Sequence, residues 1–293
     1  MFTKSMLNIW VASIGCLVIL SLCIGAPNPA AAQDCNLYGC DDDCEFTADF
    51  RIDTCSFKSK GINPWFVLLP GYTSVLETPQ DEEERERSVA TVLDDTQRIH
   101  LNGRRIETRV VEERAFEWDN DEDEWVNIEI SRNYFAICEK TNAVYYFGEW
   151  SRDCEDGFDE NDLCRGEESN KGSWEAGIDG ARPGLIMPGT PLLGARYFQE
   201  IAPPNAVDRG EIVATGLEVD LEAGRWSGCI QTSDTNPAEK ICGEGDEKTY
   251  CPSVGLVQDE NLELVWSGFA GRDEHHGRKY GDRDHKMWRW KWR

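Results

Sequence analysis

The chain has 293 residues, of which 55 are Asp or Glu and 30 are Lys or Arg, so its formal net charge is −25 at pH 7. Such an acidic chain repels phosphate groups, which excludes nucleic-acid binding by its main part. The sequence also lacks an H-E-x-x-H zinc helix, a G-x-S-x-G nucleophile elbow, a P-loop and the Rossmann glycine pattern, which discounts the enzyme classes that depend on those motifs.

The first predicted element is a signal peptide over residues 1–32. Lys4 precedes an apolar run over residues 6–26, and the alanines at 30–32 supply the small residues of a cleavage site. An uncleaved membrane anchor is the alternative, because the run is long enough to cross a bilayer. The chain has no N-x-S/T glycosylation sequence, which favours a bacterial protein. We therefore expect a secreted or periplasmic location.

A cysteine-rich leader is predicted over residues 33–60, with cysteines at positions Cys35, Cys40, Cys44 and Cys55. An even number of cysteines in an exported chain indicates disulfides, although sequence alone does not give their connectivity. A zinc site in this leader is the alternative, but the spacing lacks paired C-x2-C motifs and no histidine lies nearby.

Six further cysteines follow the leader. Local closure predicts the disulfides Cys154–Cys164 and Cys242–Cys251, because each pair brackets a polar loop. Cys138 and Cys229 lie in strand-like runs and are expected either in disulfides or as buried thiols.

Residues 61–270 are predicted to form a mainly β domain. Apolar and polar residues alternate along successive runs, which turn residues such as Pro70-Gly71 and Thr141-Asn142 separate. The predicted strands cover residues 63–69, 72–77, 81–93, 105–118, 125–139, 143–150, 195–201, 211–219, 224–232, 248–250, 254–258 and 262–268. This pattern indicates an antiparallel meander. We expect it to form a highly curved sheet or an incomplete barrel, closed by the Gly- and Pro-rich loop over residues 151–195.

Several motifs run through this β domain: Asn63-Pro64-Trp65-Phe66 with Pro70-Gly71, Ser131-Arg132-Asn133-Tyr134-Phe135-Ala136-Ile137, Val144-Tyr145-Tyr146-Phe147-Gly148-Glu149, the run over residues 172–177, the run over residues 183–188, and Tyr197-Phe198-Gln199-Glu200. With these motifs the chain resembles a family of exported bacterial β-rich proteins that has no assigned activity. The resemblance covers about two thirds of the chain and leaves out the leader and the C-terminal tail. It implies export and a β fold, and it adds no reaction.

The leading functional expectation is a non-enzymatic binding module for an apolar or amphiphilic ligand or a surface partner. Aromatic residues inside such a sheet could line a pocket, and we name Trp174, Glu175, Tyr146 and Tyr197 as candidate ligand-binding residues. The alternative is an extracytoplasmic hydrolase that uses two carboxylates. His100, in a predicted polar loop, is the one histidine of the domain that could serve a nucleophilic serine.

Metal binding is a third expectation. The acidic loop over residues 153–162 is a candidate calcium site, and His275, His276 and His285 in the tail are candidate transition-metal ligands. The tail over residues 271–293 holds eight Lys and Arg against four Asp and Glu. Its end alternates tryptophan with basic residues, which predicts either peripheral membrane contact or docking onto the acidic body of the same chain.

Overall fold

The structure is a computed structural model that describes residues 44–80, 82, 84–237 and 244–269. The chain divides into two units, residues 1–34 and residues 35–293, and every described residue belongs to the second. The predicted signal peptide and the C-terminal tail lie outside the described residues. Export by that peptide and membrane contact by that tail therefore stay predictions.

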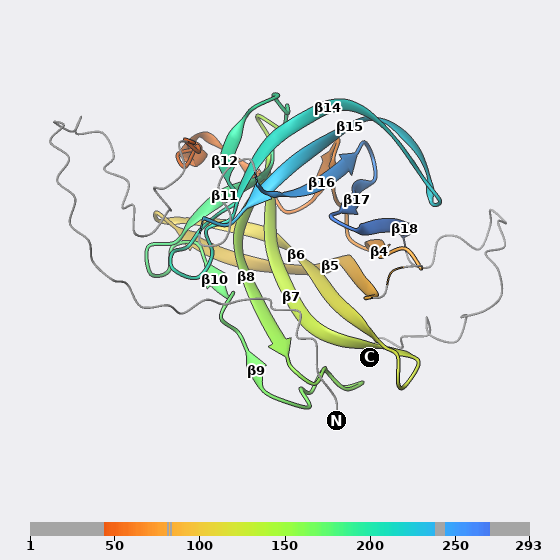
Figure 1. The fold of residues 1–293 in the computed structure, drawn as a ribbon. Coiled ribbons are helices and arrows are strands. Elements are labelled where there is room, and N and C mark those ends of the chain that lie inside the picture. Colours follow the sequence, from red (N-terminus) through yellow and green to blue (C-terminus); the bar gives the residue numbers. More distant parts are fainter. Residues whose placement is uncertain (1–43, 81, 83, 238–243, 270–293) are drawn as a thin grey trace, which may run out of the picture. The chain divides into compact units, whose positions relative to one another are not determined.

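The described residues form a mainly β protein built on one large antiparallel meander (Figure 1). Its main strands are β4 (Tyr72–Glu77), β5 (Glu86–Leu101), β6 (Arg104–Asp119), β7 (Glu124–Cys138), β8 (Val144–Cys154), β14 (Arg209–Leu221), β15 (Gly224–Thr235), β16 (Asp246–Cys251), β17 (Gly255–Asp259) and β18 (Leu262–Phe269). Strand β18 pairs with β4, so the runs β4–β8 and β14–β18 belong to one sheet. The predicted fold class is confirmed at this level.

Tight turns explain why consecutive strands pair. Asn102 and Gly103 connect β5 to β6, with φ angles of 50° and 74°. Two consecutive residues in the left-handed region form the hairpin turn whose twist matches that of the paired strands. Because pairing continues to the last position before this turn, His100 lies exposed within β5 and not in the predicted polar loop.

The segment over residues 151–195 extends the sheet and does not close it. Its short strands β9 (Glu168–Ser169), β10 (Trp174–Glu175) and β11 (Arg182–Met187) all pair with β8. A Cβ atom at Gly148 would lie 2.6 Å from the carbonyl oxygen of Trp174, so the glycine allows β10 to approach β8. This pairing satisfies backbone groups that would otherwise be exposed at the edge of β8.

The strand order corrects the predicted curvature. It begins at β12 (Arg196–Phe198) and ends at β13 (Glu200–Ile201), and no ladder among the described strands joins these two ends. The described strands therefore form an open meander sheet, and the predicted highly curved sheet or incomplete barrel is not shown. The sequence pattern misled here because alternation reports which face of a strand is buried and not how far a sheet curls.

The described part of the leader packs onto the meander. It contains the 3₁₀ turn η1 (Ile52–Thr54) and β1 (Phe57–Lys58), and β1 pairs with β7. The Phe57 ring lies edge-on to the rings of Tyr145 and Phe147, with centroid distances of 5.6 and 5.1 Å. A separate small hairpin follows, formed by β2 (Gly61–Asn63) and β3 (Phe66–Leu68).

Three disulfides join described residues: Cys55–Cys138, Cys154–Cys164 and Cys229–Cys251. The predicted pairing of Cys154 with Cys164 is confirmed. The predicted pairing of Cys242 with Cys251 is wrong, because Cys251 lies beside Cys229 on the neighbouring strand, and pairing across a sheet outweighs proximity along the chain.

The same disulfides exclude free thiols and zinc ligands among these cysteines. Cys138 and Cys229 are each bonded to a partner and are not free thiols. The leader's Cys55 is bonded to Cys138, and Cys44 is also disulfide-bonded, so neither is a zinc ligand. Disulfides form and persist in oxidising compartments, which indicates an extracytoplasmic location. Within the described ranges, no helix has the length and apolar character needed to span a bilayer.

Candidate functional site

A cavity of about 400 Å³ is bounded by strands from both runs of the meander. Strands β4 to β8 contribute one set of lining residues, and β15, β16 and β17 contribute another. Residues two positions apart on a strand share a face, so the lining follows every second residue. Successive lining residues of one strand therefore show whether the cavity wall is apolar or acidic at each point along that strand.

One end of the cavity is apolar and aromatic. The rings of Phe66 and Phe135 are 5.1 Å apart, and those of Phe135 and Tyr146 are 4.7 Å apart. Val92 pairs with Val111 across β5 and β6 at the same end. Val67, Tyr72, Ile186, Val254 and Leu256 also line the cavity, and the apolar residues Leu76 and Ala90 line it nearer to Glu113. Such a surface suits the apolar part of a ligand.

The lining becomes acidic along the strands. On β7 it changes from Phe135 through Asn133 and Ser131 to Glu129. On the neighbouring strand β6, Glu113 lies opposite Ser131. The cavity wall thus passes from aromatic to carboxylate over six residues of one strand, which corresponds to about 20 Å at the usual rise per residue.

Two glutamates of this acidic end hold protons more tightly than ordinary glutamates. Burial raises the pKa of Glu129 to about 7, and the carboxylates of Glu113 and Asp153 add to the increase. Burial also raises the pKa of Glu149 to about 8, together with the carboxylates of Glu129 and Glu113. Both groups therefore change charge near neutral pH, and such shifted groups in a cavity are typical of functional sites.

A third glutamate forms a carboxyl pair. Burial raises the pKa of Glu200 well above its usual value, and the charge of Asp208 adds to this effect. The indole Nε1 of Trp174 donates a hydrogen bond of 3.2 Å to Oε1 of Glu200. Burial also raises the pKa of Asp208, although the neighbouring Glu200 and Asn236 side chains oppose that effect. Asn236 Nδ2 donates a hydrogen bond of 2.7 Å to Oδ1 of Asp208.

Lys248 is the single cationic residue among the described residues that line the cavity. Its Nζ lies 3.1 Å from Oδ2 of Asp259. Burial lowers the pKa of Lys248, but the carboxylates of Asp259 and Asp234 outweigh that effect and the net shift is upward. The lysine therefore stays charged and neutralises Asp259, while Gln199 Nε2 donates a bond of 3.0 Å to Asp234.

The four predicted ligand-binding residues lie in different places. Tyr146 lines the cavity, and its hydroxyl donates to Oδ1 of Asn133. Trp174 is buried behind it, with the two rings 5.3 Å apart. Tyr197 is buried outside the lining, and Glu175 accepts a bond from Gln97. The structure brings Tyr146 and Trp174 together, and ligand contact by all four residues stays a prediction.

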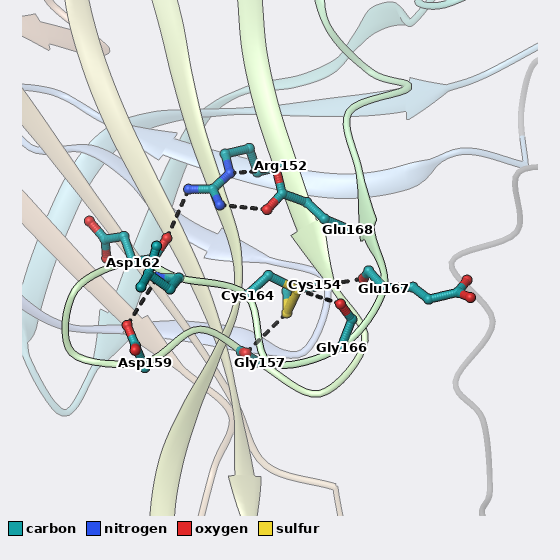
Figure 2. The surroundings of a disulfide bond; sticks show 10 residues. Arg152, Cys154, Gly157, Asp159, Asp162, Cys164, Gly166, Glu167 and Glu168 are labelled. Atoms are coloured by element: carbon teal, nitrogen blue, oxygen red, sulfur yellow. Dashed lines mark hydrogen bonds and ion pairs between the residues drawn. A yellow bond between two sulfur atoms is a disulfide. The ribbon is translucent and has the colours of Figure 1, made fainter.

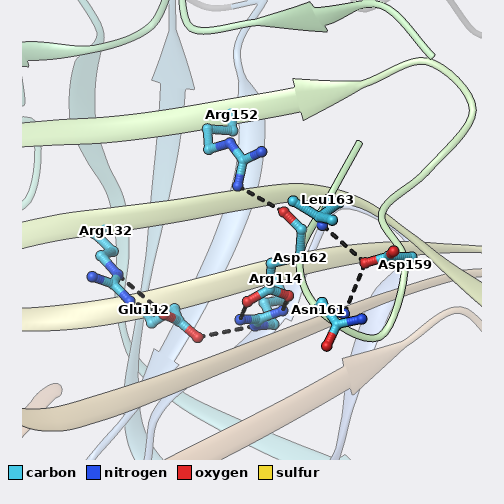
Figure 3. A network of polar contacts seen from close by, with 8 residues as sticks. All are labelled: Glu112, Arg114, Arg132, Arg152, Asp159, Asn161, Asp162 and Leu163. Atoms are coloured by element: carbon cyan, nitrogen blue, oxygen red, sulfur yellow. Dashed lines mark hydrogen bonds and ion pairs between the residues drawn. The ribbon is translucent and has the colours of Figure 1, made fainter. Parts of the chain in front are cut away.

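The acidic loop predicted to bind calcium is closed by the Cys154–Cys164 disulfide (Figure 2). Arg114 Nη1 and Nη2 lie 2.7 and 3.0 Å from the two carboxylate oxygens of Asp162 (Figure 3). These hydrogen bonds hold the pKa of Asp162 below its usual value. Oδ1 of Asp159 accepts backbone N–H bonds of 2.8 and 3.0 Å inside the loop. Both carboxylates thus stabilise the loop through hydrogen bonds to protein groups. Their position in the loop is therefore explained by these contacts and does not require a bound metal ion.

The opposite side of the loop is held by Arg152. Its Nε and Nη2 lie 2.8 and 2.5 Å from the carboxylate of Glu168, and its Nη1 donates to the Asp162 carbonyl (Figure 2). Within the part of the chain that the structure describes, no group of three or more His, Cys, Asp or Glu residues is arranged to hold a metal ion. His275, His276 and His285 lie outside that part, so their metal binding stays a prediction.

Sequence reasoning did not find the acidic end of the cavity. Its members are Glu113, Glu129, Glu149, Glu200, Asp208 and Asp234. The chain has 55 acidic residues, so a pair of carboxylates on neighbouring strands carries no signal by itself. A usable signal existed on β7, where Glu129, Ser131 and Asn133 share a face with Phe135 and interrupt the apolar alternation expected of a buried face.

Comparisons with known proteins give no information about the function of this chain. No protein-family model matches the chain, and neither does any curated protein or solved structure. The resemblance to exported bacterial proteins therefore stays a prediction from sequence motifs.

Proposed function

We propose that this protein is an exported, non-enzymatic binding protein that holds a small amphiphilic molecule in its cavity. The observation that carries the proposal is the two-sided lining, with Phe66 and Phe135 at one end and Glu113 and Glu129 at the other. The volume of about 400 Å³ lies in the range of sites for small organic ligands. The proposal depends on this cavity and not on closure of the sheet.

An amphiphile fits this cavity better than a purely apolar ligand. Removing water from carboxylates without supplying new partners costs several kcal/mol for each group. A wholly apolar ligand that reached Glu113 and Glu129 would incur this cost, whereas a polar head would replace the water. The aromatic end, in turn, offers few partners to a wholly polar ligand.

Filling the cavity is expected to abolish binding. Ala90 lines the cavity on β5, and Ala90→Phe would place a ring inside it. The probe is N-phenyl-1-naphthylamine, a neutral dye that fluoresces in apolar surroundings. We expect saturable binding to the unmodified protein and an affinity lowered by about tenfold or more in the variant, a difference of about 1.4 kcal/mol per tenfold.

The matched control is Val89→Phe, which adds a ring at the adjacent position, on the opposite face of β5. It should bind the dye like the unmodified protein. Absence of dye binding by the unmodified protein, or equal binding by Ala90→Phe, would contradict the proposed function.

The carboxyl pair favours a second candidate, an extracytoplasmic hydrolase. Burial raises the pKa of Glu200 well above its usual value, so a protonated Glu200 would be a general acid, and the neighbouring Asp208 would be the general base when ionised. Glu200→Gln removes the transferable proton but keeps a hydrogen-bonding side chain. If the protein hydrolyses chromogenic esters or glycosides, this variant should be slower by about a hundredfold. Unchanged hydrolysis in the variant, or no hydrolysis by the unmodified protein, would count against this candidate.

A further inference from the structure

We propose that the ligand's polar head is a cation, an ammonium or a guanidinium group, bound by Glu113, Glu129 and Glu149. This inference rests on the proposed function and names the chemical class of its ligand. Its basis is the charge of the cavity wall. Acidic residues lining the cavity are Glu113, Glu129, Glu149, Glu200, Asp208, Asp234 and Asp259, against Lys248 as the one base. Among the described lining residues, acidic groups therefore outnumber the basic one.

Part of this charge already has a protein partner. Asp259 pairs with Lys248 at 3.1 Å. Glu200 accepts the Trp174 bond, and burial favours its protonated, uncharged form. Asp234 accepts a bond from Gln199. The three glutamates of β6, β7 and β8 have no ion pair with a described residue, and Ser88 donates a hydrogen bond of 2.7 Å to Glu113.

These three glutamates surround one point on the sheet. Glu113 lies opposite Ser131 across the β6–β7 pairing, and Glu129 is two residues from Ser131 along β7. Glu149 lies opposite Asn133, which is two residues from Ser131 in the other direction. The mutual repulsion of these groups contributes to the raised pKa values of Glu129 and Glu149. A bound cation would turn this repulsion into attraction.

An unsatisfied polar atom in the same cavity is an independent observation. Oδ1 of the cavity-lining Asp234 is buried and has no hydrogen-bond partner among the described residues, although Oδ2 accepts a bond from Gln199. Buried polar groups in folded proteins nearly always have partners. This atom therefore indicates that the polar end is completed by an occupant that donates hydrogen bonds.

The geometry also explains why the cation should carry an apolar chain. Glu129 lies six residues along β7 from Phe135, whose ring contacts Phe66, whereas Glu149 lies between them, opposite Asn133. A cationic head among the glutamates would direct a chain of about 20 Å or less, estimated from the strand rise, towards those rings. A basic amphiphile satisfies both ends at once.

The test compares three ligands with the same ten-carbon chain at pH 8: decylammonium, decanol and decanoate. Each is measured by displacement of N-phenyl-1-naphthylamine from the full chain. We expect decylammonium to bind about tenfold more tightly than decanol, and decanoate to bind most weakly. Displacement by none of the three would refute the proposed function itself, whereas decanol binding as tightly as decylammonium would overturn only the inference about charge.

Variants locate the effect within the protein. In Glu113→Gln/Glu149→Gln, the advantage of decylammonium over decanol should fall below about threefold, while decanol affinity stays unchanged. This variant should fold, because it removes repulsion between buried groups. Glu122→Gln, on an exposed turn between β6 and β7, is the control and should keep the full advantage. An advantage that persists in Glu113→Gln/Glu149→Gln would show that these glutamates do not bind the head.

Discussion

Replacing Cys55 and Cys138 together with alanine is expected to lower the free energy of unfolding by about 4–5 kcal/mol. The bond joins residues 83 positions apart in the sequence, and a cross-link over a long loop removes much of the freedom of the unfolded chain. Both cysteines are also buried, at 5% and 0% exposure, so the variant loses packing as well. The measurement is urea unfolding of the oxidised protein and the variant.

The Cys154–Cys164 disulfide provides the internal comparison. It spans only 10 positions, so its removal by Cys154→Ala/Cys164→Ala should cost about 2.5–3 kcal/mol in the same loop-entropy relation. The described leader is attached to β7 through Cys55, and its detachment should raise the susceptibility of residues 44–60 to proteolysis. Equal losses for the two variants, or a larger loss for the short loop, would contradict this explanation of the stability.

Raising the pH from 5 to 9 is expected to destabilise the folded protein. Glu129 and Glu149 have folded-state pKa values of about 7 and about 8, above the usual value of a glutamate in an unfolded chain. The carboxylates facing them are Glu113, Asp153 and Asp208. The folded state therefore binds more protons than the unfolded state between these limits, and its stability falls as pH rises.

The expected size is a decrease in Tm of about 5–10 °C, if about two pK units of the combined shift survive the access of water to the cavity. In Glu129→Gln/Glu149→Gln, the Tm should depend less on pH and should be higher than that of the unmodified protein at pH 9. The measurement is thermal unfolding at constant ionic strength. A Tm that rises between pH 5 and pH 9 in the unmodified protein would show that these groups are not held protonated by the fold.

Local features of the fold were predictable from the sequence. The alternation over residues 105–118 and 125–139 corresponds to β6 and β7, and the predicted strand over residues 72–77 has the bounds of β4. Period-2 patterns and turn residues act within a few positions, so one sequence contains all the information that they need. The same reasoning gave the Cys154–Cys164 disulfide, which closes a short loop.

Long-range features were not predictable in the same way. Cys251 pairs with Cys229 because β15 and β16 are neighbours, and the register of that pairing places the two cysteines side by side. The short strands of the segment over residues 151–195 pair with β8, although its glycines and prolines indicated a loop. In both cases tertiary pairing overrides local preference.

In the candidate site, too, the residue with a local signal was predicted and the residues that depend on long-range pairing were not. Tyr146 was named from its aromatic character and lines the cavity. Glu113, Glu129 and Glu149 were not named, because their chemistry arises only when three strands place them around Ser131. A carboxylate on a strand is an ordinary solvated residue unless its neighbours remove the water. The raised pKa values of Glu129 and Glu149 are thus properties of the folded arrangement and not of the residue types.

The most direct test of the account is a crystal structure of the protein grown with 10-bromodecylamine at pH 8, with anomalous scattering used to find the bromine. The account predicts a bromine peak beside Phe66 and Phe135, and density for the amine within hydrogen-bond distance of Glu113, Glu129 or Glu149. A bromine peak outside this cavity, or a reversed ligand with its amine among the aromatic rings, would contradict the account.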